Sequence, residues 1–258
     1  MRAASLLGFA LAAVLMANNE NPRNCMSPVF WEDFKDAKLD ASKWSLANPD
    51  LARVEFLSPK FKATANIKQH DYMRGILRLG FKMTPEGPRG AGITSLMSFH
   101  QYSLSRNRIS PIYFEAKLRL NVTPGHRGVF RVRNHKEDDL PLSDLTFQGG
   151  AGLAYPWARL SSQGGTRDFP PSRGEDGYLR TPEERDGFNV YGIKWYQDRY
   201  DFFLNDFKVA QIDNPDPAKG FVISISHTAY ESDRKNFDGK VSLDDIEVDW
   251  VKVYADLN

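Results

Sequence analysis

One short segment carries polar side chains at a spacing that lets them act together. The decapeptide PLSDLTFQGG spans residues 141–150. Read as a β-strand, it places Asp144, Thr146 and Gln148 on one face and apolar residues on the other. This face offers a carboxylate, a hydroxyl and an amide in a row. A carboxylate can act as a nucleophile, but an amide cannot donate a proton at any useful pKa.

Arginine side chains gather on the strand predicted just before it. The segment GVFRVRN, residues 128–134, also alternates, so Arg131 and Arg133 share one face. The same inside/outside alternation puts them on the face that carries Asp144. Guanidinium groups grip sulfate or carboxylate groups through paired hydrogen bonds, which favours an anionic ligand. The alternative is that the arginines only neutralise nearby acids such as Asp144 and Glu115.

The rest of the chain supplies strands to position these rows. Segments rich in β-branched and aromatic residues recur, the clearest being IYFEAKLRL at residues 112–120. Pairs of Gly, Pro, Asn and Asp between them predict turns, and no stretch shows sustained helical periodicity. We therefore predict an all-β fold, an antiparallel two-sheet β-sandwich or a barrel. Residues 161–184 are rich in Gly, Pro and charge and predict a long surface loop.

Composition narrows the class of protein. The chain has 258 residues, of which 41% are hydrophobic, enough for one large core. A net charge of +1 gives no field that would recruit nucleic acid or a membrane surface. The aromatic content of 12% suits both a large β-domain core and sugar binding. Cys25 is the single cysteine, so no intramolecular disulfide can form.

The N-terminus reads as a targeting segment. Arg2 precedes an apolar run of about fifteen residues, which is too short to span a bilayer comfortably and fits a signal peptide. We expect a signal peptide over residues 1–17, an N-terminal extension over 18–28 and a single domain over 29–258. No later stretch is long and apolar enough to cross a membrane. The expected location is secreted, either extracellular or periplasmic.

Four segments, in order, resemble sequences of glycoside hydrolase family 16. That family includes laminarinases, lichenases, agarases and carrageenases on a concanavalin-like jelly roll. The matching segments are FWEDFKDAKLDASKW (30–44), ITSLMSF followed by IYFEAKLRL (93–99 and 112–120), FNVYGIKWYQDRYDFFLND (188–206) and VDWVKVY (248–254). The resemblance implies a concanavalin-like jelly roll and a polysaccharide ligand. It is more specific for the fold than for the activity.

The resemblance also implies roles for the polar row. The family's active strand carries Glu-x-Asp-x-Glu, in which the first Glu is the nucleophile, the Asp assists and the last Glu is the acid/base. Counting along from the matched strands places Asp144, Thr146 and Gln148 at these positions. A register with one extra residue would use Leu142, Asp144 and Phe147, which is worse for catalysis. Neither register keeps two reacting carboxyls, which retaining hydrolysis needs about 5 Å apart.

Further residues enter the site through the resemblance. Glu115 lies on a strand that neighbours the active strand in the family, where it contacts sugar, and Arg131 stands where the family has a stacking Trp. Tyr155 and Trp157 alternate onto one face and would stack on a pyranose ring, with core packing as the alternative. Asp249 matches the position of an Asp that holds a structural calcium in some members. No other cofactor is implied.

Three hypotheses for function follow. The preferred one is a secreted, non-catalytic protein that binds a sulfated or uronic extracellular polysaccharide through Arg131, Arg133 and Gln148. The second is an active hydrolase of O-glycosyl bonds, or a lyase, that uses other residues. Its candidate acids are those of KEDDL at 136–140, which otherwise form a solvated turn. The third is a structural component of an extracellular layer.

Overall fold

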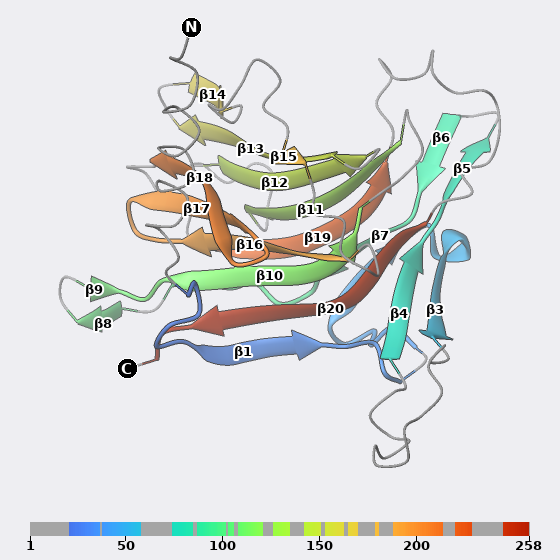
Figure 1. The fold of residues 1–258 in the computed structure, drawn as a ribbon, viewed down its shortest axis with the longest axis horizontal. Coiled ribbons are helices and arrows are strands. Elements are labelled where there is room, and N and C mark those ends of the chain that lie inside the picture. Colours follow the sequence, from blue (N-terminus) through green and yellow to red (C-terminus); the bar gives the residue numbers. More distant parts are fainter. Residues whose placement is uncertain are drawn as a thin grey trace, which may run out of the picture.

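The computed structural model describes fourteen stretches of the chain: residues 21–36, 38–57, 74–84, 87–101, 103–105, 108–120, 126–134, 142–150, 153–162, 165–169, 179–180, 188–213, 220–228 and 245–257. Their regular structure is almost entirely β-strand, with one short 3-10 helix, η1 (Pro49–Leu51) (Figure 1). The predicted all-β class is confirmed. Within these stretches, no helix is both long and apolar enough for a membrane span.

Two antiparallel sheets make up the fold. Sheet A has the strand order β18 (Phe207–Asp213), β17 (Arg199–Leu204), β16 (Asn189–Trp195), β10 (Ile112–Arg119), β20 (Ile246–Ala255), β4 (Arg74–Leu79) and β3 (Ala52–Leu57), with β1 (Ser27–Glu32) paired to β20. Sheet B has the order β14 (Gly165–Phe169), β13 (Leu153–Ser162), β12 (Leu142–Gly150), β11 (Arg127–Asn134), β19 (Phe221–Thr228), β7 (Gly92–Ser95) and β2 (Trp44–Ala47), with β15 (Leu179–Arg180) paired to β13. Two small hairpins complete it, β5 (Phe81–Thr84) with β6 (Gly87–Gly90) and β8 (Ser103–Ser105) with β9 (Arg108–Ile109).

The core lies between the two sheets. Phe147 of β12 contacts Tyr191 of β16 and Phe202 of β17 across the interface, with ring centroids 5.3 and 5.5 Å apart. On β10 the side chains of Phe114 and Ala116 belong to this core, on the face that the alternation predicted. Each large apolar side chain buried in this way stabilises the fold by roughly 1.5–3 kcal/mol.

The strand pairing tests two local predictions, one for a turn and one for a loop. Asn205 and Asp206 form the predicted hairpin turn between β17 and β18, and both have the positive φ that this turn requires, 49° and 67°. The expected long loop at residues 161–184 is wrong in part, because it contains β14, β15 and the end of β13. Strands at the edge of a sheet are held by backbone hydrogen bonds to one neighbour and need no apolar alternation. The composition of this segment therefore gave no sign of β14 and β15.

The two segments that together form the second family match, ITSLMSF and IYFEAKLRL, are not neighbours in a sheet. The segment ITSLMSF contributes to β7 in sheet B, whereas IYFEAKLRL forms β10 in sheet A. Strand β7 pairs with β19 and β2, and β10 pairs with β16 and β20. Strand identity was correctly predicted, but sequence order does not reveal which sheet a strand joins.

Candidate functional site

The polar row predicted from residues 141–150 lies on β12, on the outer face of sheet B. In the register with β11, Asp144 pairs with Arg133 and Thr146 pairs with Arg131. Residues directly opposite each other in an antiparallel pair project to the same face. The intervening apolar residues of β12 are fully buried and face the core. The two arginines therefore share a face with Asp144, as the alternation predicted.

Asp144 is held by two neighbours on this face. Its Oδ1 lies 3.2 Å from Nε of Arg131 and accepts a hydrogen bond from Oγ1 of Thr146 at 3.0 Å. The side chain of Arg131 is 33% exposed and that of Asp144 is 18% exposed. The pair lies at the surface of the sheet, where water or a ligand reaches it.

Gln148 is held by a third arginine. Its Oε1 accepts a hydrogen bond from Nη1 of Arg127 at 3.0 Å, and the Gln148 side chain is buried. Arg127 is the first residue of β11. We call the surface formed by Asp144, Thr146 and Gln148 with Arg127, Arg131 and Arg133 the motif face.

Hydroxyl groups extend the motif face across two more strands. Ser224 of β19 pairs with Arg131, and Thr94 of β7 pairs with Ser224. Oγ1 of Thr94 lies 3.3 Å from Oγ of Ser224. One level of the sheet thus carries Thr146, Arg131, Ser224 and Thr94 in a row. The sequence analysis missed Ser224, although the alternation in FVISIS at 221–226 signalled it.

The aromatic candidates lie beside the motif face in the backbone register. Strand β13 pairs Tyr155 with Gln148 and Trp157 with Thr146. The side chains of both aromatic residues lie outside the described residues, as do the acids of the segment 136–140. Their contact with a ligand stays a prediction.

Glu115 lies in the other sheet, so its predicted place beside the strand of Asp144 is wrong. It is on the outer face of β10, where its side chain is 1% exposed. Arg23, from the segment before β1, donates from Nε to Glu115 Oε2 at 2.9 Å and places Nη2 2.7 Å from the same oxygen. A second acid, Asp206, binds Nη2 at 2.7 Å. Glu115 is therefore a partner of Arg23 and not part of the motif face.

Asp249 also has a basic partner. Its buried carboxylate lies 3.2 Å from Nζ of Lys117 on the neighbouring strand β10. Over the part of the chain that the structure describes, no three His, Cys, Asp or Glu side chains converge on a point. Among these described residues Asp249 is therefore paired with a lysine and is not part of a three-ligand cluster, and the calcium site stays a prediction.

Comparison with known proteins supports the fold. No protein-family model matches the chain, and no curated protein sequence matches it. Among solved structures, the GH16 protein of the Bacteroides ovatus mixed linkage glucan PUL, in complex with its product, superposes with a TM-score of 0.61 at 14% identity, covering 87% of this chain and 99% of that one. The κ-carrageenase of Pseudoalteromonas carrageenovora, in complex with an oligotetrasaccharide of κ-carrageenan, gives 0.59 at 14% identity over 89% and 95%.

A third structure agrees with these two. The laminarinase of Flavobacterium sp. UMI-01 superposes with a TM-score of 0.58 at 16% identity, covering 88% of this chain and all of that one. Identities this low establish a common fold. The predicted likeness to the jelly roll of family-16 glycoside hydrolases is therefore confirmed at the level of the fold.

Proposed function

We propose that the chain is a secreted protein that holds a polysaccharide against the motif face without hydrolysing it. The observation that carries this proposal is the buried Gln148, bonded to Arg127, at the position that the family resemblance assigns to the acid/base. The solved structures with this fold include proteins bound to glucan or carrageenan fragments, which supports a saccharide as the ligand class.

The chemistry of the motif face favours binding over hydrolysis. Retaining hydrolysis needs one carboxyl as nucleophile and another, about 5 Å away, as acid and base. Among the described side chains of the motif face, Asp144 is the one carboxylate, and its Oδ1 is engaged by Arg131 and Thr146. The amide of Gln148 orients a ligand through hydrogen bonds but cannot protonate a leaving group.

The charge of the motif face favours an anionic polysaccharide. Its described side chains include three arginines and one aspartate. A sulfated or uronic chain would pair with half-exposed guanidinium groups such as that of Arg131. Each such charge-assisted contact contributes roughly 1.5–3 kcal/mol. A neutral glucan offers no such partner.

Calorimetry with matched galactans tests this proposal. We expect binding to a sulfated galactan such as κ-carrageenan, no measurable binding to a neutral galactan, and affinity that falls as salt rises because charges at the surface are screened over about 10 Å at 0.1 M. The variant Arg131→Ala/Arg133→Ala should lose at least tenfold in affinity at the motif face. Arg199→Ala is the matched control, because Arg199 is also 33% exposed but lies on sheet A.

One result would reject the anionic ligand. Binding to a neutral glucan that does not depend on salt and survives the double substitution would show that the arginines only neutralise nearby acids. Turnover in place of simple binding would reject the non-catalytic role.

Secretion is a separate part of the proposal. The apolar run that predicts the signal peptide lies outside the described residues. Mass spectrometry of the exported protein should find an N-terminus at Asn18. Protein that stays in the cytoplasm with its first residues intact would reject this part alone.

A further inference from the structure

A cluster of two tryptophans and a lysine lies on the outer face of sheet A, the side of the sandwich away from the motif face. Trp31 of β1 pairs with Lys252 of β20, and Trp250 precedes Lys252 by two residues on the same face. Nζ of Lys252 is 4.8 Å from the centre of the Trp31 ring and 4.2 Å from that of Trp250. We call these three side chains the Trp–Lys cluster.

The Trp–Lys cluster is open to solvent. The side chain of Trp31 is 53% exposed, and Val29 beside it on β1 is 37% exposed. Figure 1 shows why, because β1 lies at the margin of sheet A, next to β20. A large aromatic ring left in water on a sheet face forgoes the gain from burial.

The polar atoms of the Trp–Lys cluster are all donors. Two indole N–H groups and one ammonium have no acceptor partner among the described residues, apart from the ring faces beside Lys252. Glu115, which lies opposite Lys252 in the register, is already bound by Arg23. Flat ring surfaces with donors and no acceptors fit a sugar ring that carries sulfate or carboxylate, since the ring stacks and the anion meets the ammonium.

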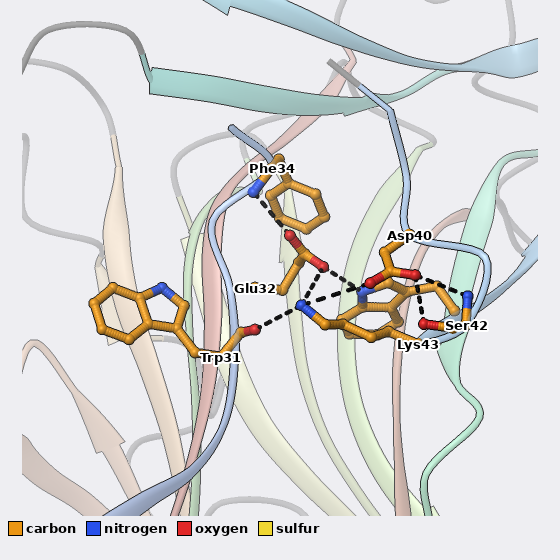
Figure 2. A network of polar contacts seen from close by, with 7 residues as sticks. Trp31, Glu32, Phe34, Asp40, Ser42 and Lys43 are labelled. Atoms are coloured by element: carbon orange, nitrogen blue, oxygen red, sulfur yellow. Dashed lines mark hydrogen bonds and ion pairs between the residues drawn. The ribbon is translucent and has the colours of Figure 1, made fainter. Parts of the chain in front are cut away.

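The backbone that presents Trp31 is fixed before any ligand arrives. Lys43 Nζ donates to the carbonyl oxygen of Trp31 at 3.1 Å and to Glu32 at 3.3 Å. Glu32 also accepts from Nε1 of Trp44 at 3.3 Å and from the backbone N–H of Phe34 at 3.0 Å. Figure 2 shows the Trp31 ring pointing away from this network. A pre-ordered side chain loses less conformational entropy on binding.

We propose that the Trp–Lys cluster is a second site for anionic polysaccharide, which makes one molecule bivalent. The ligand class rests on the proposed function, but the residues and the sheet are independent of it. Because the two sites lie on opposite faces of the sandwich, one molecule can hold two polysaccharide chains and join them. Two linked sites also raise the avidity for a polymer without any new contact.

Stoichiometry of binding separates the two sites. The probe is a short κ-carrageenan oligosaccharide, too short to reach both faces, titrated into the full chain by calorimetry. We expect two sites in the wild type, one in Trp31→Ala/Lys252→Gln and one in Arg131→Ala/Arg133→Ala. With polymeric κ-carrageenan, light scattering from joined chains should appear for the wild type and disappear in either double variant. Phe207→Ala is the matched control, an aromatic residue 51% exposed on β18.

Each outcome decides between the two proposals. Two sites that persist in Trp31→Ala/Lys252→Gln overturn the second site and leave the motif face untouched. Loss of binding in that variant together with full binding in Arg131→Ala/Arg133→Ala overturns the motif face as the ligand site and keeps the Trp–Lys cluster. A wild type that binds one oligosaccharide, lost only in the arginine variant, also overturns the second site. Trp31→Phe, which keeps a ring, should retain most of the affinity.

Discussion

Arginine–carboxylate pairs lie on both sheets of the sandwich, and one pair from each sheet shows a difference in burial. On sheet A, Arg23 Nη2 lies 2.7 Å from Glu115, whose side chain is 1% exposed. On sheet B, Arg131 Nε lies 3.2 Å from Asp144, whose side chain is 18% exposed. A buried carboxylate depends on its one cation, whereas a half-exposed carboxylate can exchange its partner for water or a ligand. The first pair is therefore fixed, and the arginine of the second pair can change its partner.

The segment before β1 causes this difference in burial. Residues 21–26 lie over β10 and β16, where Lys194 Nζ donates to the carbonyl oxygen of Pro22 at 2.8 Å. The guanidinium of Arg23 lies 5.9 Å from the centre of the Tyr113 ring. Strand β10 is consequently buried on both faces along residues 112–116, although its sequence alternates like a half-exposed strand.

The largest effect should come from removing Arg23. Arg23→Ala leaves Glu115 as a buried carboxylate without its cation, and we expect a loss of about 3 kcal/mol in the free energy of unfolding, the lower end of the usual range because Arg23 is partly exposed. Chemical denaturation measures this loss. Lys35→Ala, which removes an exposed ion pair with Asp33, should change it by no more than about 0.5 kcal/mol. Equal effects of the two variants would contradict a structural role for Arg23.

The same buried region predicts alkaline sensitivity. Burial raises the pKa of Tyr254 to about 12, with the Glu115 carboxylate adding to the effect, and burial also raises the pKa of Tyr113 well above its usual value. An unfolded tyrosine ionises near pH 10, so stability is full below about pH 10 and falls as the pH rises towards 12. Tyr254→Phe should make the loss of stability between pH 10 and pH 12 shallower. At pH 7, where the tyrosine is neutral in both states, the substitution should bring no such gain in stability. An unchanged slope would count against the assignment.

A smaller and more informative effect is expected at Asp144. Asp144→Asn keeps an oxygen for the Thr146 hydroxyl but removes the charge that competes for Arg131. Stability should drop by at most about 1 kcal/mol, as for other half-exposed pairs. Affinity for a sulfated galactan should rise by up to about fivefold, the equivalent of about 1 kcal/mol. Weaker binding would mean that Asp144 itself contacts the ligand.

The alternation of side chains along single strands correctly predicted which residues share the motif face. It correctly placed Asp144 and Thr146 on one face with Arg131 and Arg133, because side-chain direction in a strand depends only on local sequence. The family resemblance placed the strand of Glu115 wrongly, since pairing between distant strands decides which sheet holds β10. The hydrogen bond between Arg23 and Glu115 could not be predicted either, because it joins residues 92 positions apart in the sequence.

We propose that the motif face binds polysaccharide but does not cleave it. A reducing-end assay on a sample in which binding is also measured tests this most directly. Full-length wild type is incubated for a long period with κ-carrageenan and, separately, with laminarin and mixed-linkage glucan, while affinity electrophoresis records binding in the same samples. The account predicts retardation by κ-carrageenan with no reducing ends or unsaturated product above a heat-denatured control. Turnover on any of these polymers that disappears in Asp144→Ala would contradict it and make Asp144 a catalytic nucleophile.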